Sequence, residues 1–176
     1  MREADLAVID GPAGPTVPNH YLLRLHPTEL ATAEAHDILL EQLAAVVEET
    51  ATTRGWRLDG PAVVEIESLP SVVPGSIECE TSIRQGRLRA WAHLIELNDQ
   101  RRLSIRHNRA LLGRSEQADI RLEEAAVSRF HALLWRETGQ AWVVDLGSSN
   151  GTLLNGGRVR DAQSLQPGDA LTFGVA

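Results

Sequence analysis

The stretch of sequence that decides the fold runs from Gly113 to Val159 and reads GRSEQADIRLEEAAVSRFHALLWRETGQAWVVDLGSSNGTLLNGGRV. Its short apolar segments alternate in polarity and are separated by turn-forming residues. One such turn is Asn155-Gly156, a pair that readily adopts the positive φ angles of a tight hairpin. Short strands separated by turns are typical of a β-sandwich. The two-residue period begins at Trp91, so we predict an all-β sandwich over residues 91–176.

Four blocks within this region place polar residues where predicted strands end. They are Gly113-Arg114-Ser115, Ser128-Arg129-Phe130-His131, Ser148-Ser149-Asn150-Gly151-Thr152 and Asn155-Gly156. Each block alone has an ordinary explanation: a strand-ending turn with a solvated arginine, a buried histidine, or a turn rich in Ser, Asn and Gly. Taken together, in this order and at these spacings, the blocks resemble the forkhead-associated (FHA) family, whose domains bind phosphothreonine peptides.

The resemblance implies a role for individual residues. Arg114 and Ser128 are expected to contact the phosphate, and Arg129 to add a donor. Ser149 is expected beside the phosphate, with Asn150 holding the peptide main chain. The family pattern assigns structural support to Gly113, His131, Gly151, Thr152, Asn155 and Gly156, with the histidine bracing the serine loop from below.

The chemistry of the ligand agrees with these residue types. A phosphothreonine carries about −1.5 to −2 charge and three strong acceptor oxygens, so its binding site needs a fixed cation and several neutral donors. The chain has no lysine, and arginine must supply that cation. Ser128 lies three residues before His131, but no orienting acid or oxyanion element accompanies them, so we predict no enzyme. The six histidines are scattered, and neither a metal site nor a cofactor is expected.

Charge divides the 176 residues into two halves. Residues 1–83 contain 4 arginines and 14 acidic residues, whereas residues 84–176 contain 13 arginines and 10 acidic residues. No block is strongly basic or interleaved with aromatic residues, so nucleic acid is not expected as a partner. Cys79 is the single cysteine, which excludes an intrachain disulfide. The sequence shows neither a membrane-spanning run nor a signal peptide, and we expect a cytoplasmic protein.

The first half is predicted to be a small α+β domain of β-α-β-β order. A strand at His20–Leu25 precedes a helix that Thr28 caps and that ends near Thr53. Two further strands follow, at Ala62–Glu67 and Ser76–Ile83. Residues 1–18 contain closely spaced glycines and prolines and are predicted to lack regular structure. The helix is expected to bury one apolar stripe, made of Leu39, Leu43, Val46, Val47 and Thr50.

This half resembles the N-terminal domain of actinobacterial FhaA-type proteins, a domain of unknown function that precedes an FHA domain. The residues that carry the resemblance are Val17-Pro18-Asn19-His20-Tyr21, Arg54-Gly55-Trp56 and Gly60-Pro61. We therefore predict a domain at residues 1–83, a linker at residues 84–90 and the FHA domain at residues 91–176. The linker is much shorter than is usual in that family.

The resemblance implies a phosphothreonine-dependent adaptor in bacterial Ser/Thr kinase signalling, with partners in cell-wall synthesis or division. Two alternatives stay open at this point. The FHA surface could serve as a structural or oligomerisation module without phosphate, or residues 1–83 could hold an enzyme. Thr50, Thr52 and Thr53 could be kinase targets that dock into the FHA site, although water-exposed threonines at a helix end are the simpler interpretation.

FHA domains usually continue into one more strand than this sequence shows. Without that strand, the segment Trp91–Leu97 would expose an unpaired edge. We expect the edge either to drive self-association or to be covered by the N-terminal half.

Overall fold

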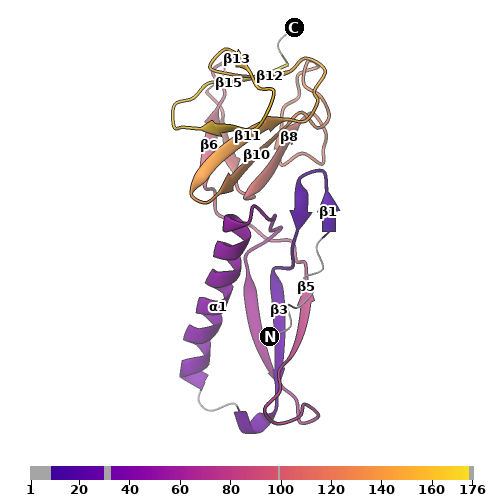
Figure 1. The fold of residues 1–176 in the computed structure, drawn as a ribbon, viewed down its shortest axis with the longest axis vertical. Coiled ribbons are helices and arrows are strands. Elements are labelled where there is room, and N and C mark those ends of the chain that lie inside the picture. Colours follow the sequence, from indigo (N-terminus) through magenta and orange to yellow (C-terminus); the bar gives the residue numbers. More distant parts are fainter. Residues whose placement is uncertain (1–8, 30–32, 99, 175–176) are drawn as a thin grey trace.

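The computed structural model describes residues 9–29, 33–98 and 100–174. The molecule is elongated, with a β-sandwich at one end, and helix α1 and a three-stranded sheet extending from it (Figure 1). The N-terminal elements are β1 (Ile9–Gly11), β2 (Gly14–Thr16), β3 (His20–Leu25), the 3-10 helix η1 (Pro27–Glu29), α1 (Ala33–Thr53), β4 (Val63–Ser68) and β5 (Glu78–Ser82). The later strands are β6 (Ala92–Ile95), β7 (Arg102–Ile105), β8 (Arg109–Gly113), β9 (Ile120–Arg121), β10 (Ala132–Glu137), β11 (Gln140–Asp145), β12 (Thr152–Leu154), β13 (Gly157–Arg158), β14 (Gln163–Leu165) and β15 (Leu171–Phe173).

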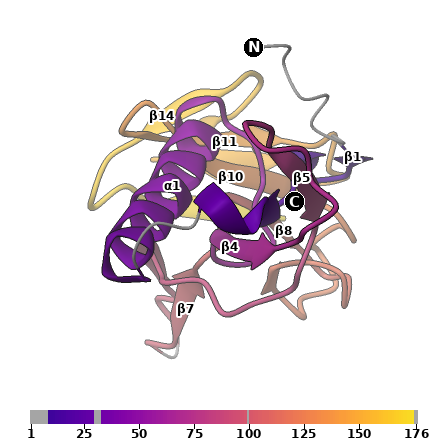
Figure 2. The same ribbon diagram turned by 90° about the horizontal axis from the view of Figure 1, so that it is seen from below.

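The predicted β-α-β-β order of the first half is confirmed. Strand β3 lies at the centre of the sheet β4-β3-β5, parallel to β4 and antiparallel to β5. Parallel neighbours need a crossover connection, and α1 supplies it. Figure 2 shows α1 running beside β4.

The prediction that residues 1–18 lack regular structure is wrong for the residues that the structure describes. β1 and β2 pair as an antiparallel hairpin, with Asp10 opposite Pro15. Proline is tolerated there because β2 is an edge strand, where a missing N–H is not needed. The carbonyl of Pro15 accepts a hydrogen bond from Arg57 N at 2.7 Å, and Ala13 packs against Leu111 and Leu133 of the sandwich. These long-range contacts outweigh the local turn signals.

The helix prediction needs two corrections. Thr28 lies within η1, and α1 is described from Ala33; residues 30–32 lie outside the described residues. The apolar stripe is only partly buried, because Leu39 is 47% exposed and Val46 57% exposed. The helix meets a narrow sheet at one flank, so only part of the stripe finds apolar neighbours. Ala51, one residue beyond the predicted stripe, is the helix residue in the small core with Val17 and Leu58.

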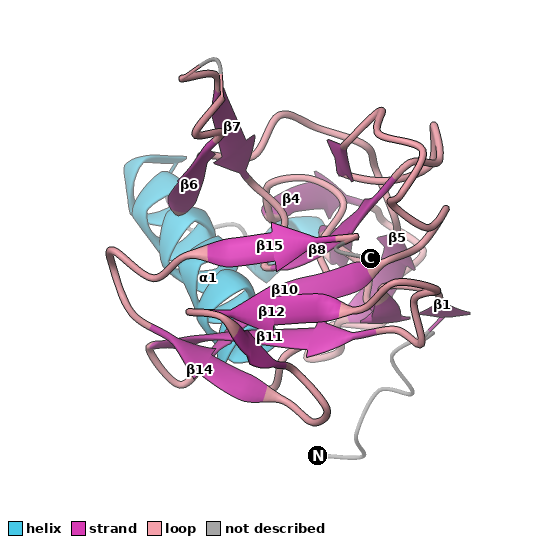
Figure 3. Cartoon of the chain, turned by 90° about the horizontal axis from the view of Figure 1, so that it is seen from above, coloured by secondary structure: helices cyan, strands magenta, loops and turns pink. Residues whose placement is uncertain are grey.

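The predicted β-sandwich is also confirmed. A five-stranded sheet, β14-β11-β10-β8-β9, faces a three-stranded sheet, β13-β12-β15 (Figure 3). Apolar residues from both sheets form the core, which includes Leu112, Leu134, Val143, Val159 and Phe173. The Asn155-Gly156 turn between β12 and β13 has the predicted positive φ angles, 50° and 81°.

The segment between β5 and β6 contains no helix or strand, and it is fastened to the N-terminal half. The buried Asn19 side chain accepts a hydrogen bond from Arg84 N at 2.8 Å and donates to Arg84 O at 2.9 Å and Pro61 O at 3.0 Å. Gly60 permits this approach, since a Cβ there would lie 2.5 Å from Arg84 O. The short connection is therefore held in place, and the division at residues 84–90 stays a proposal.

The two halves meet at one end of β8 and β10. Arg57 donates to both carboxylate oxygens of Asp119, at 2.7 and 2.9 Å. The buried Asn108 side chain bonds Leu58 N at 3.1 Å and also the carbonyl of Trp56. Arg109 donates to Gly55 O at 3.0 Å.

This junction does not cover the edge formed by Trp91–Leu97. Among the described residues β6 pairs only with β7, so the expected coverage by the N-terminal half is wrong. The junction forms elsewhere because its polar partners, Arg57 and Asn108, lie next to β8. Within the described ranges, no helix has the length and apolar character needed to span a membrane.

Candidate functional site

The first loop of the site begins where β8 ends. Arg114 N donates to Ser128 O at 2.9 Å and Ser115 N donates to Arg129 O at 3.1 Å, so the two segments run side by side. A Cβ at Gly113 would lie 2.2 Å from Arg129 O. Only glycine allows this approach, which explains the residue that precedes the arginine.

The Arg114 side chain is exposed and partly oriented by its own domain. Its Nε donates to Val127 O at 3.2 Å. Neither terminal amino group of Arg114 bonds to a residue in the described part of the chain, so both can reach an external anion. Planar guanidinium groups pair well with phosphate oxygens.

The second and third loops are joined by two hydrogen bonds. Ser149 N donates to Ser128 Oγ at 3.1 Å, and Asn150 Nδ2 donates to Ala126 O at 2.8 Å. As an acceptor in the first bond, the Ser128 hydroxyl keeps its own hydrogen for a ligand. The amide of Asn150 keeps its oxygen, an acceptor suited to a peptide N–H.

His131 is fully buried beneath these loops. Its Nδ1 accepts from Ser128 N at 3.0 Å, which requires the hydrogen on Nε2, and Nε2 donates to Gly151 O at 3.1 Å. The ring also meets the Phe173 ring edge-on, with centroids 5.7 Å apart. The histidine therefore connects the loop of Ser128 to the loop of Gly151 from inside the sandwich.

Asp145 sets the shape of the third loop. Its carboxylate accepts from Ser148 N at 2.8 Å, Ser148 Oγ at 2.6 Å and Thr152 Oγ1 at 2.7 Å. Burial alone would raise the pKa of Asp145, but hydrogen bonds from Ser148 and Thr152 outweigh it and lower the pKa. The loop carries Ser149 and Asn150 on a frame that is fixed before any ligand arrives.

The family profile described as "FHA domain" matches residues 110–174, and the profile "FhaA, N-terminal domain" matches residues 1–80. The oxoglutarate dehydrogenase inhibitor of Corynebacterium glutamicum is 32% identical over 130 residues, which are 72% of this chain and 85% of that protein. The chain belongs to the FHA family.

Two further matches cover smaller parts of the chain. The glycogen accumulation regulator GarA of Mycolicibacterium smegmatis is 44% identical over 62 residues, covering 35% of this chain and 39% of that protein. The crystal structure of the FhaA FHA domain in complex with the intracellular domain of Rv3910 is 29% identical. That match has a TM-score of 0.43 and covers 47% of this chain and 89% of that one. Both curated relatives are named as regulatory proteins, and phosphothreonine-dependent interactions have been described for FHA domains.

The structure brings the predicted residues of the FHA domain to one end of the sandwich. Arg114, Ser128, Ser149 and Asn150 are linked through the hydrogen bonds described above. Arg129 has an exposed side chain on the middle loop, while its carbonyl is used within the fold. Their roles toward a ligand stay predictions.

Arg158, on β13, is a residue of this region that the sequence did not suggest. Gly151 has a φ of 86°, and a Cβ there would lie 2.8 Å from Arg158 Nη2. The hairpin turn at Asn155-Gly156 therefore brings a second guanidinium against the loop that contains Ser149. In the sequence, Arg158 is simply an arginine two residues beyond the turn. Its position next to Gly151 could be predicted only if the register of β12 and β13 were known.

Thr50, Thr52 and Thr53 lie away from the site. They end α1, whose neighbour in the sandwich is β10, and Thr52 Oγ1 donates to Glu48 O at 2.8 Å. The helix reaches the end of β10 that holds Glu137, whereas the site lies at the other end, beside His131. The candidate site of this chain is therefore not adjacent to Thr50, Thr52 or Thr53. No group of three or more histidine, cysteine, aspartate or glutamate residues in the described ranges is placed to hold a metal ion.

Proposed function

We propose that this chain is an adaptor that binds proteins phosphorylated on threonine within a bacterial Ser/Thr kinase pathway. The partner would be the kinase itself or one of its substrates. The resemblance of residues 1–80 to the FhaA N-terminal domain suggests a partner in cell-wall synthesis or division.

One observation carries the proposal: Arg114 and the Ser128 hydroxyl lie on adjacent, hydrogen-bonded loops and keep donors for a ligand. Arg114 would pair its terminal amino groups with two phosphate oxygens, and Ser128 would donate to a third. Ser149 and Arg129 would add donors at the rim, and Asn150 would bind the peptide backbone. No proton or group is transferred, so the mechanism is recognition alone.

Calorimetric titration of a phosphothreonine peptide library, each peptide paired with its unphosphorylated form, tests the proposal. We expect saturable binding of phosphorylated peptides only. Equal affinity for both forms would instead support the alternative, a phosphate-independent oligomerisation module.

Substitution of the cation gives the sharper test. Hydrogen bonds to a charged group contribute about 1.5–3 kcal/mol, so Arg114→Ala should weaken binding by about 10- to 150-fold without changing the fold. Arg114→Lys should restore only part of the affinity, because an ammonium group lacks the planar fork. Arg102→Ala, which removes an exposed arginine on β7, is the matched control and should bind as the unaltered chain does. Unchanged affinity of Arg114→Ala would contradict the proposed site.

A further inference from the structure

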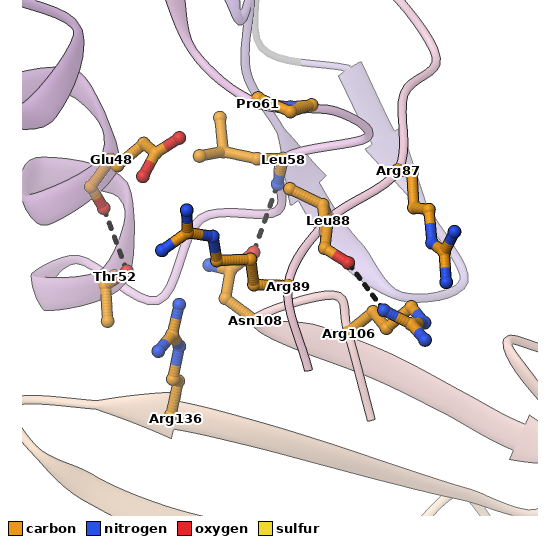
Figure 4. Close-up of a pocket in the computed structure, with 10 residues that line it drawn as sticks. All are labelled: Glu48, Thr52, Leu58, Pro61, Arg87, Leu88, Arg89, Arg106, Asn108 and Arg136. Carbon is orange, nitrogen blue, oxygen red and sulfur yellow. Dashed lines mark hydrogen bonds between the residues drawn. The ribbon is translucent and has the colours of Figure 1, made fainter. Parts of the chain in front are cut away.

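A cavity lined by arginines lies between the two halves, at the end of the sandwich away from the loops that carry Arg114, Ser128 and Ser149. It is a cavity of about 460 Å³ bordered by α1, the segment after β5, the β7–β8 turn and β10. Its polar lining consists mainly of Arg87, Arg89, Arg106 and Arg136, with Glu48 and Thr52 on the helix side. Figure 4 shows the guanidinium groups of Arg89 and Arg136 pointing into the same space near Glu48.

The charge in this cavity is opposite to that of the whole chain. Four arginines stand against one carboxylate, whereas the chain carries a net charge of −7. One oxygen of the Glu48 carboxylate already has a hydrogen bond, because Oε1 accepts from Ala62 N at 3.1 Å. Arg106 is held by Leu88 O at 2.8 Å, which fixes one cation at the wall. Arg89 and Arg136 point toward one space, where their charges repel each other, and an anion between them would offset that repulsion.

One arginine of this cavity, Arg136, has an incomplete set of hydrogen bonds. Its Nε is buried, and in the described part of the chain this atom has no hydrogen-bond partner. Its backbone is fixed by the bond from Arg136 N to Asn108 O at 2.9 Å, and its guanidinium lies 5.8 Å from the centre of the Trp91 ring. Burial lowers the pKa of Arg136 and the charge of Glu48 only partly opposes this. A buried donor without a partner costs free energy. An acceptor atom on a ligand would remove that cost by bonding to Arg136 Nε.

We propose that this cavity binds a small anion that carries phosphate groups, held chiefly by Arg89 and Arg136. Guanidinium groups match phosphate in charge and in planar, paired hydrogen-bond geometry. The volume lies in the range of small-molecule sites, about 300–1,000 Å³, and exceeds the space that one phosphate ion fills. The arginines come from both sides of the junction, so the bound anion would contact the linker and β10 together.

An NMR amide titration of the full chain with inorganic pyrophosphate tests the proposal, with citrate as the carboxylate comparison. We expect saturable shifts at Glu48, Arg89 and Arg136, and weaker binding of citrate. The Arg114→Ala variant should bind pyrophosphate at these residues as well as the unaltered chain does. That result would separate this cavity from the phosphothreonine site.

Variants complete the test. Arg136→Gln should weaken pyrophosphate binding by about tenfold or more, and Arg89→Gln, on the segment outside the sandwich, should do the same if Arg136→Gln fails to fold. Arg102→Gln removes the same charge on β7 and should have less than a twofold effect. The proposal is overturned if pyrophosphate gives no saturable shifts, if shifts appear only around Arg114, if citrate binds equally well, or if Arg102→Gln weakens binding as much as Arg136→Gln.

Discussion

The buried ion pair between Arg57 and Asp119 should contribute strongly to the free energy of unfolding. Arg57 makes two bonds to the Asp119 carboxylate, at 2.7 and 2.9 Å, and its Nε donates to Asp59 at 2.7 Å. The side chains of Arg57 and Asp119 are only 14% and 12% exposed. Removing one partner of a buried ion pair leaves the other charge uncompensated and costs about 3–5 kcal/mol. We therefore expect Arg57→Ala to lower the free energy of unfolding by about that amount.

Urea unfolding followed by far-UV circular dichroism measures this loss. For a domain of this size 1 kcal/mol corresponds to about 2–4 °C, so Tm should also fall by about 6–20 °C. Arg24→Ala is the matched control, since Arg24 also contacts two carboxylates, those of Glu67 and Glu80, but lies at the surface. Surface pairs contribute little because water screens them, and the control should change stability only slightly. A loss for Arg57→Ala no larger than that for Arg24→Ala would refute the reasoning.

A double variant isolates the pair itself. Once Asp119→Asn has removed the carboxylate, Arg57→Ala should cost less than it does in the unaltered chain, because the buried Asp119 charge is no longer left uncompensated. The two effects should therefore be non-additive. Simple additivity would show that Arg57 acts through Asp59 or the Arg109 carbonyl instead.

Three further predictions concern other parts of the molecule. His131→Ala should lower Tm, and it should weaken phosphopeptide binding only indirectly, by disordering the loop that carries Ser128. Unchanged Tm with abolished binding would instead show that the histidine contacts the ligand. Burial alone would raise the pKa of Asp119, but hydrogen bonds from His107, Arg57 and Leu111 N and the charge of Arg57 hold it well below its ordinary range. Its stabilising effect is thus complete above about pH 4 and is lost as pH falls, so Tm measured from pH 7 to pH 3 should fall less steeply in Asp119→Asn. The exposed β6 hairpin, where Ile95 is 49% and Leu97 80% exposed, should support self-association that Ile95→Lys reduces; light scattering that shows a monomer at every concentration would contradict this.

The parts of the fold that could be predicted rest on local chemistry. The Asn155-Gly156 turn follows from residues that accept positive φ, and the structure has that turn. Gly113 is needed where two loop backbones approach, but its neighbour Arg129 is distant in sequence, so the family resemblance marked this glycine. Asp145 shapes its loop through bonds to Ser148 and Thr152, three and seven residues further along the chain. For the hairpin turn and for Asp145, the signal and its cause lie within seven residues of each other.

The parts that were missed depend on partners distant in sequence. Pro12 and Pro15 predicted an irregular N-terminus, but the β1–β2 hairpin forms because Arg57 and Arg109 bond its carbonyls. The basic cavity combines Arg89 with Arg136, whose separation in sequence hides their proximity. No local pattern marks such sites, since the fold creates them by bringing strands and linker together.

Strand β8 links these separate observations. Its first residue, Arg109, is fastened to Gly55 of the N-terminal half, and its last, Gly113, leads into the loop that carries Arg114. Asp119 closes that loop by accepting from Leu111 N at 2.7 Å, and the same carboxylate binds Arg57. Because one carboxylate holds both the middle of β8 and a residue of the other half, the N-terminal half helps to fix the frame on which Arg114 stands. The contacts of Arg109 with the N-terminal half lie at the opposite end of β8 from the proposed phosphate site.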